Sequence, residues 1–105
     1  MRMQIIAGTE VLLSIDGFFV EPEQWREEMA TYLTKEEGID QLSPAQWVLI
    51  RFMRNEYEHK GTGPSVRALS RSSGVPIRVV HELFPKGPAK EAARLAGIPK
   101  PVGCT

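Results

Sequence analysis

The chain has 105 residues, of which 42% are hydrophobic and 25% charged, and its 13 basic side chains balance 13 acidic ones. This composition suits one globular domain and excludes a chain that is disordered throughout. No apolar run approaches the roughly 18 residues that a membrane span needs, and the first residues lack the pattern of a signal peptide. We therefore expect a cytoplasmic protein that does not contact a membrane.

The overall balance of charge conceals two halves of opposite sign. Residues 1–59 contain 5 basic and 11 acidic side chains, whereas residues 60–105 contain 8 basic and 2 acidic ones. Such a split indicates either a basic surface for nucleic acid or an acidic partner, or two halves that attract each other within the fold. The sequence leaves both interpretations open.

Residues 3–20 are predicted to form β-structure. Two short apolar runs, Met3–Ile6 and Val11–Ile15, are followed by an Asp16-Gly17 turn and by a third run over Phe18–Val20. This pattern predicts a small hairpin or a three-stranded meander. Because an isolated hairpin is only marginally stable in water, we expect it to pack against helices.

The first predicted helix begins at Pro22, since proline suits the first helical position, and ends near Gly38. Its large apolar side chains recur at helical spacing, which places them on one face. These residues are Trp25, Met29, Tyr32 and Leu33.

The second predicted helix has the clearest start in the chain. Ser43 is a good N-cap, Pro44 follows it, and Gln46 stands three residues after the cap, which is the spacing of a capping box. Gly61 is the predicted stop. Because apolar residues wrap much of its first two turns, we expect this helix to be the central one.

Three shorter helices, each starting after a proline, are predicted up to Gly97; the prolines are Pro64, Pro76 and Pro88. The predicted fold class is therefore mainly α. It is a small helical bundle with an N-terminal β-hairpin, a helix-turn-helix-like segment and an extended, flexible C-terminal arm. We place one domain over residues 1–97 and a mobile arm over residues 98–105.

The helix-turn-helix-like segment is predicted from the spacing of Ser70, Gly74 and Val80, which suit the small, turn and packing positions of that motif. Nearby arginines would contact phosphates or a partner protein; they are Arg67, Arg71 and Arg78. Many helical domains contain two short helices joined by a glycine turn, so the motif also has a purely structural interpretation.

The last eight residues carry the only cysteine of the chain, Cys104. Two prolines stiffen this arm toward an extended form, and a glycine leaves the thiol room to enter a narrow site. The predicted recognition residues of the arm are Pro99, Lys100, Pro101 and Gly103. The nearby carboxylate of Thr105 disfavours the thiolate, so partners must activate the thiol. The alternative is a disordered terminus with an incidental cysteine.

Other chemical motifs are scarce. The sequence contains no glycine-rich phosphate loop, no catalytic triad pattern and no His-x-x-x-His pair, and its two histidines, His59 and His81, are isolated. We expect neither a metal nor an organic cofactor.

Two runs carry a family resemblance: Leu-Phe-Pro-Lys-Gly-Pro-Ala-Lys over residues 83–90 and Ala-Gly-Ile-Pro-Lys-Pro-Val-Gly-Cys over residues 96–104. They resemble the DsrC/TusE family of sulfur-relay proteins, also called the gamma subunit of dissimilatory sulfite reductase, and the match extends over nearly the whole chain. The resemblance implies a mostly helical domain with a small β element and a mobile C-terminal arm. It also implies that Cys104 carries sulfur as a persulfide.

The chain departs from part of this family. Members that serve sulfite reductase are similar to one another in a second cysteine upstream of the last, and this chain has Ala93 there. The segment between Leu69 and Leu83 is also shorter than in those members. Both departures favour the single-cysteine, TusE-like branch, whose members pass sulfur toward 2-thiouridine at the wobble position of tRNA.

The resemblance thus implies a sulfur carrier of the sulfurtransferase type rather than a self-sufficient enzyme. A donor complex similar to TusBCD or DsrEFH would load Cys104, and the arm would deliver the sulfur to an acceptor such as a tRNA thiouridylase. Two alternatives remain open. One is an accessory gamma-type subunit of sulfite reductase in sulfur oxidation or reduction. The other is a single-cysteine helix-turn-helix regulator that binds DNA. For a sulfur carrier we expect at most weak contact with nucleic acid.

Overall fold

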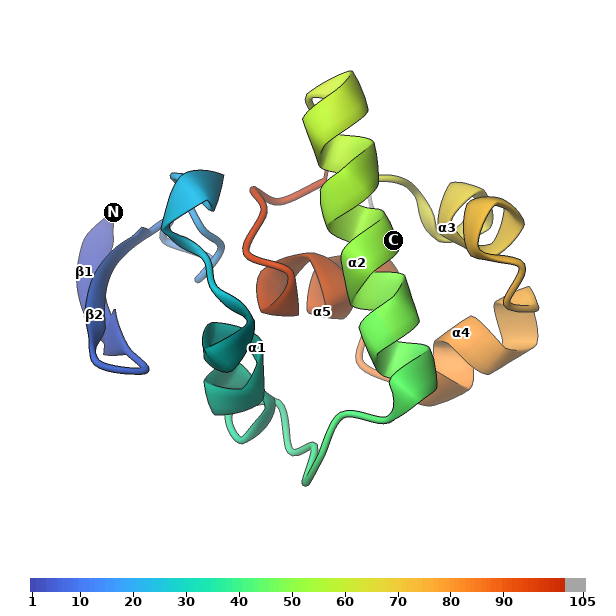
Figure 1. Ribbon diagram of the computed structural model, residues 1–105, viewed down its shortest axis with the longest axis horizontal. Helices are drawn as coiled ribbons and strands as arrows, with labels where there is room; N and C mark the ends of the chain where they lie inside the picture. Colours follow the sequence, from blue (N-terminus) through green and yellow to red (C-terminus); the bar gives the residue numbers. More distant parts are fainter. Residues whose placement is uncertain (102–105) are drawn as a thin grey trace.

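A two-stranded hairpin opens the chain in the computed structural model, which describes residues 1–101 (Figure 1). β1 (Arg2–Ile6) pairs antiparallel with β2 (Thr9–Leu13). The two turn residues, Ala7 and Gly8, have φ angles of 49° and 81°, as a tight hairpin turn requires. Of the third predicted run only Phe19 forms a bridge to β2. The hairpin is therefore confirmed, and the three-stranded meander is wrong.

The first predicted helix is divided in two. A 3-10 turn, η1 (Pro22–Gln24), is followed by α1 (Glu27–Thr34). Between them Trp25 has an extended backbone, with φ −75° and ψ 141°. One continuous helix as far as Gly38 is therefore wrong, because Trp25 leaves the helical conformation and turns its indole toward the end of the last helix.

The predicted apolar face of this segment is only partly buried. Met29 and Leu33 lie in the core with 0% and 1% of their surface exposed, whereas Tyr32 on the same helix is 43% exposed. Trp25 packs against the core from outside α1. The periodicity correctly identified two core residues of α1 and did not detect the break before it.

The long helix α2 (Pro44–Lys60) starts and stops as predicted. The Ser43 hydroxyl accepts a hydrogen bond from the Gln46 backbone N–H at 3.2 Å, and the Gln46 side chain accepts one from the Ser43 N–H at 2.8 Å. Gly61 ends the helix with φ 75°. The Gln46 amide also donates to the Leu83 carbonyl at 2.7 Å, so this one side chain caps α2 and joins it to the end of α4.

α3 (Val66–Ser73) and α4 (Ile77–Leu83) form the helix-turn-helix-like segment at the far side of the bundle from the hairpin (Figure 1). Gly74 joins them in the left-handed conformation. The Ser70 hydroxyl donates a hydrogen bond across the turn to a backbone carbonyl at 2.6 Å, and Val80 is fully buried. All three positions predicted from spacing have their expected structural roles.

The short helix α5 (Pro88–Leu95) lies behind α2 and packs against each of the other four α-helices of the described chain (Figure 1). Small side chains allow this close approach; the fully buried ones are Ala89, Ala92, Ala93 and Ala96. We expected α2 to be central, and α2 shares that place with α5. None of the helices within residues 1–101 has the length and apolar character needed to cross a membrane.

Candidate functional site

Two of the first four residues of the predicted arm, Ile98 and Pro101, are packed on the body of the protein. Ile98 is fully buried and Pro101 is buried, and both rest on Gly63, where a Cβ atom would lie 2.8 Å from Ile98 Cδ1 and 3.3 Å from Pro101 Cγ. Packing therefore continues past the predicted boundary at residue 97, because these two apolar side chains are buried against the backbone at Gly63. Gly103 and Cys104 lie outside the described residues, and mobility beyond residue 101 stays a prediction.

The end of α5 is held by two side chains from other parts of the chain. Trp25 Nε1 donates a hydrogen bond to the Leu95 carbonyl at 2.8 Å, and Arg54 Nη1 donates to the Ala96 carbonyl at 2.8 Å. The last carbonyls of a helix have no partner within the helix, so these two donors supply what α5 lacks. Arg54 Nη2 also donates to the Pro22 carbonyl at 3.3 Å.

The two side chains also contact each other. The Arg54 guanidinium lies 4.4 Å from the centroid of the Trp25 ring, a favourable cation–π distance. Partial burial lowers the pKa of the Arg54 guanidinium. We call Trp25, Arg54 and the backbone of residues 95–98 that they hold the arm base.

Gly97 is the sharpest steric constraint in the arm base. Its φ angle is 67°, and a Cβ atom there would lie 2.2 Å from Trp25 Cδ1. The Gly97 N–H donates to the Arg94 carbonyl and the Ile98 N–H to the Ala93 carbonyl, both at 3.2 Å. These bonds close α5 and set the direction in which the chain leaves it, and only glycine fits at this point.

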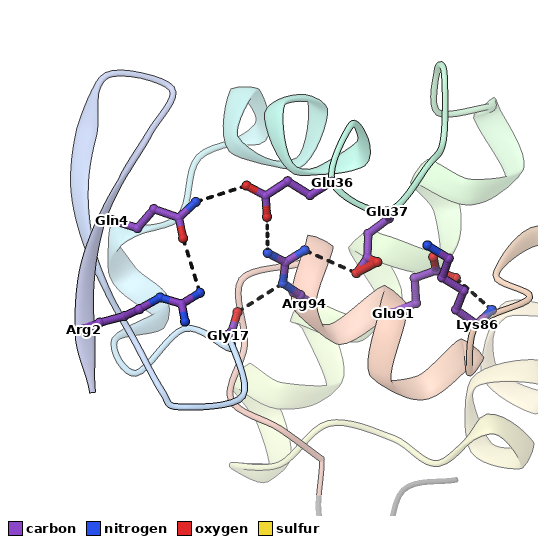
Figure 2. Close-up of polar contacts among 8 residues, drawn as sticks. All are labelled: Arg2, Gln4, Gly17, Glu36, Glu37, Lys86, Glu91 and Arg94. Carbon is purple, nitrogen blue, oxygen red and sulfur yellow. Dashed lines mark hydrogen bonds and ion pairs between the residues drawn. The ribbon is translucent and has the colours of Figure 1, made fainter.

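On its other side α5 is tied through Arg94 to the loop that follows the hairpin and to the turn that follows α1, as Figure 2 shows. Arg94 donates to the Gly17 carbonyl at 3.2 Å and to the Glu37 carboxylate at 3.2 Å, and it also pairs with Glu36. The hydrogen bond from Arg94 lowers the pKa of the Glu36 carboxyl. Lys100 pairs with Asp16 at 3.3 Å. These contacts between the acidic and basic halves favour the interpretation in which the halves attract each other.

Glu91 is an unusual residue on the same side of α5. It is 4% exposed, its Oε1 accepts a long hydrogen bond of 3.4 Å from the Lys86 N–H, and its Oε2 has no hydrogen-bond partner within residues 1–101 (Figure 2). Burial raises the pKa of this carboxyl, and the nearby Glu37 raises it further.

The three arginines predicted to contact nucleic acid or a partner are exposed on α3 and α4. Arg78 pairs with Glu82 at 3.6 Å one turn along α4, and Arg67 lines a shallow hollow with His81. Arg71 makes no ion pair within the described part of the chain. Their role as contact residues stays a prediction.

Sequence reasoning missed the role of Trp25 and Arg54 at the arm base. Trp25 was predicted as a face residue of a helix, and Arg54 was assigned no role from the sequence. The positive φ required at Gly97 is the one local signal of a special backbone there, and it does not identify the donors. No group of three or more His, Cys, Asp or Glu residues is placed to hold a metal within residues 1–101.

The fold and the arm base define a class of protein: a small helical domain with an N-terminal hairpin, closed by a helix whose end supports a cysteine-bearing C-terminal segment. The family model described as "DsrC like protein" matches residues 5–105. The chain belongs to the DsrC family, and the resemblance stated from its motifs is confirmed.

Individual relatives agree with this assignment. The dissimilatory-type sulfite reductase subunit gamma of Nitratidesulfovibrio vulgaris (strain Hildenborough) is 42% identical over 89 residues, which cover 85% of each chain. The sulfurtransferase TusE of Escherichia coli (strain K12) is 38% identical over 109 residues, covering 97% of this chain and 99% of that one. The crystal structure of dissimilatory sulfite reductase I (DsrI) superposes with a TM-score of 0.88 at 36% identity, covering 99% of this chain and 100% of the other. These names place the chain in a sulfur-relay family.

Proposed function

We propose that this protein is a persulfide carrier that accepts a sulfane sulfur on Cys104 and delivers it for the synthesis of 2-thiouridine at the wobble position of tRNA. The observation that carries the proposal is the single cysteine of the chain, which stands three positions after Pro101, the last residue that the structure describes. A relative named sulfurtransferase TusE covers nearly the whole chain, in agreement with this role.

The transfer balances without an added oxidant or reductant. The Cys104 thiolate attacks the terminal sulfur of a donor persulfide, so that a new S–S bond forms on Cys104 while the S–S bond of the donor breaks. The electron pair of the broken bond leaves on the donor as a thiolate, and the proton of the Cys104 thiol goes to solvent or to a partner base. An acceptor thiolate then repeats the exchange on the Cys104 persulfide.

The single cysteine favours the TusE-like role over one that needs an internal disulfide. The position of the second cysteine in sulfite-reductase members is Ala93, which is fully buried in α5. Cys104 therefore exchanges sulfur with partner thiols and not with a second thiol of its own chain. Its partners in this proposal are a donor complex of the TusBCD or DsrEFH type and an acceptor such as a tRNA thiouridylase.

The exposed part of the arm supplies contacts for these partners. Lys100 is exposed, and within residues 1–101 its side chain is held only by a surface pair with Asp16, which is easily exchanged for a partner carboxylate. Pro99 lines a small hollow with Tyr57 and Gly63 at the start of the arm. We assign partner recognition to the arm residues Pro99, Lys100 and Gly103, whereas Pro101, predicted together with them, is buried against Gly63 and holds the arm on the body of the protein.

Intact mass spectrometry tests the loading step. After incubation with inorganic polysulfide, or with a cysteine desulfurase and L-cysteine, the wild type should gain one reducible sulfur and Cys104→Ser should gain none. The Cys104→Ser variant should keep the thermal unfolding temperature of the wild type, which excludes misfolding as the reason. An equal gain in the variant would refute Cys104 as the carrier.

Nucleoside mass spectrometry tests the destination of the sulfur. Deleting the protein from its own organism should lower 2-thiouridine in tRNA, and the wild type but not Cys104→Ser should restore it. Unchanged 2-thiouridine after the deletion would exclude the tRNA branch.

A second candidate function is an accessory gamma-type subunit of sulfite reductase. The identity of 42% to a relative with that name favours it. This alternative predicts that the tagged protein purifies together with a sulfite reductase from its own organism and that the deletion changes sulfite metabolism while 2-thiouridine stays constant.

A further inference from the structure

We propose that Trp25 and Arg54 are positioning residues for sulfur transfer, because they fix the point from which the cysteine-bearing end of the chain extends. This inference rests on the proposed carrier function of Cys104. Neither side chain is part of the arm, and neither touches the reacting sulfur in this proposal. They act on the arm through two consecutive backbone carbonyls.

The contacts are specific and come from distant parts of the sequence. The Trp25 indole reaches a carbonyl 70 residues later, and the Arg54 guanidinium reaches one 42 residues later. Both bonds measure 2.8 Å, and the two donors are stacked at 4.4 Å. A helix end at a protein surface can satisfy its carbonyls with water. Here two side chains of the protein supply the donors, so the end of α5 is fixed to Trp25, directly after η1, and to Arg54 on α2.

The next residues continue this fixed path. Gly97 is confined by the Trp25 ring, and Ile98 and Pro101 pack on Gly63. The chain is therefore held from Leu95 to Pro101. Cys104 stands three positions after Pro101, and an extended chain advances at most about 3.6 Å per residue, so a chain held as far as Pro101 limits the reach of the Cys104 Cα to roughly 11 Å from that residue.

Release of the arm base would change this reach. If the chain were held only as far as Gly97, Cys104 would stand seven positions after the fixed point, and the limit would rise to roughly 25 Å. A thiol confined near one point meets a docked partner at a higher effective concentration than a thiol on a longer tether. Docking also costs less conformational entropy when fewer residues must be ordered. The arm base thereby favours transfer to and from a docked protein, whereas a small reagent finds the thiol in either state.

The chain offers a matched control for Arg54. Arg51 lies on the same helix, its guanidinium stands 5.1 Å from the centroid of the Trp47 ring, and it pairs with the exposed Glu27 at 3.2 Å. Arg51 thus has the same chemistry, a tryptophan partner and a place on α2. Its hydrogen bond goes to Glu27 and not to the arm base.

The experiment compares two sulfur donors on the same variants. Rates of Cys104 persulfidation are measured with inorganic polysulfide and with a persulfide-loaded cysteine desulfurase, and the ratio of protein-donor rate to polysulfide rate is the readout. Arg54→Met should lower this ratio about tenfold, and Arg51→Met should leave it within twofold of wild type. Trp25→Phe keeps an aromatic ring, smaller than the indole, and removes the N–H donor, so it should give a smaller loss. An unchanged ratio in Arg54→Met, or an equal loss in Arg51→Met, would overturn the positioning role.

Hydrogen exchange of the Ile98 amide measures the anchoring of the arm directly and does not depend on the sulfur donor. The Ile98 amide donates to the Ala93 carbonyl, and its exchange should accelerate at least tenfold in Arg54→Met and not in Arg51→Met, with amides in the middle of α2 unchanged as an internal check of folding. Equal protection of Ile98 in both variants would refute the anchor. If instead the wild type takes up no sulfur on Cys104 from either donor while Ile98 responds as expected, the carrier function fails and the anchoring of the arm does not.

Discussion

The two sides of α5 are held by different kinds of contact. On the side of α2, Trp25 and Arg54 donate to neutral backbone carbonyls and stack on each other. On the side of the hairpin, Arg94 is held by the carboxylates of Glu36 and Glu37, and Glu91 is buried with one oxygen unpartnered in the described structure.

This difference predicts different responses to solution conditions. Carbonyl acceptors do not titrate, so the arm base keeps its hydrogen bonds across the physiological pH range. Carboxylate pairs weaken when the acids are protonated and when salt screens them. The side of α5 that supports the arm is therefore insensitive to pH, whereas the attachment of the hairpin and α1 varies with it. Variants on each side of α5 test whether the two sides respond differently.

Gly97→Ala should have the largest effect. A Cβ atom would lie 2.2 Å from Trp25 Cδ1 at a backbone φ of 67°, so the variant combines left-handed strain with overpacking. We expect a loss on the order of 3 kcal/mol in the free energy of unfolding, measured by urea denaturation. Gly61→Ala is the control, since its φ is similar at 75° and nothing lies within 4 Å of the added atom. Equal losses in the two variants would show that backbone strain alone causes the loss of stability and that the contact with Trp25 contributes nothing to it.

Local signals in the sequence predict some features of this fold and miss others. Proline and glycine signals located the helices after residue 43 because caps and stops are local in sequence: Ser43, Gln46 and Gly61 act within one turn of their helix. The break at Trp25 was missed because it arises from a hydrogen bond to a carbonyl 70 residues away, and no local propensity encodes such a contact.

The same limit applies to the candidate site. The family motif pointed to Cys104 and the arm, since both are continuous in sequence. Arg54 could not be assigned, because an arginine on a helix is ordinarily a solvated surface residue and only the fold brings it to Ala96. Burial of Ile98 and Pro101 was likewise invisible, since their partner Gly63 lies in a distant loop.

Arg94→Met should have the second largest effect, on the hairpin side. It removes the donors to Gly17, Glu36 and Glu37 while keeping the apolar stem, and it leaves a largely buried Glu37 carboxylate without its cation. We expect a loss of roughly 2 kcal/mol in the free energy of unfolding at pH 7.

This loss should depend on pH in a defined direction. Arg94 lowers the folded pKa of Glu36, so the stability from this pair is present above the unfolded pKa of the carboxyl and is lost as the pH falls through the folded pKa. Urea denaturation from pH 7 to pH 3 should therefore show the wild type and Arg94→Met converging in acid. A constant difference across this range would contradict the role of the carboxylates. The protection of the Ile98 amide should change little in Arg94→Met at pH 7, which would separate the two sides of α5 directly.

Glu91→Gln should have the smallest effect, and it should be a gain. Burial raises the folded pKa of Glu91, so its favourable contribution to stability is fully present below the unfolded pKa and is lost as the pH rises through the folded pKa. Above the unfolded pKa the wild type must either bury this charge or bind a proton that the unfolded chain has released, and Oε2 has no partner within residues 1–101. Glutamine keeps the shape and removes that charge. We expect Glu91→Gln to raise the free energy of unfolding by about 1 kcal/mol at pH 7, the lower end of the cost of an unsatisfied buried group. This gain should disappear as the pH falls toward 4.

Thermal unfolding at several pH values measures the gain in Glu91→Gln, and Glu10→Gln, at an exposed position, is the control that should show no gain. A stabilisation that persists unchanged in acid would mean that the glutamine forms a new hydrogen bond and that the charge of Glu91 is not what weakens this side of α5.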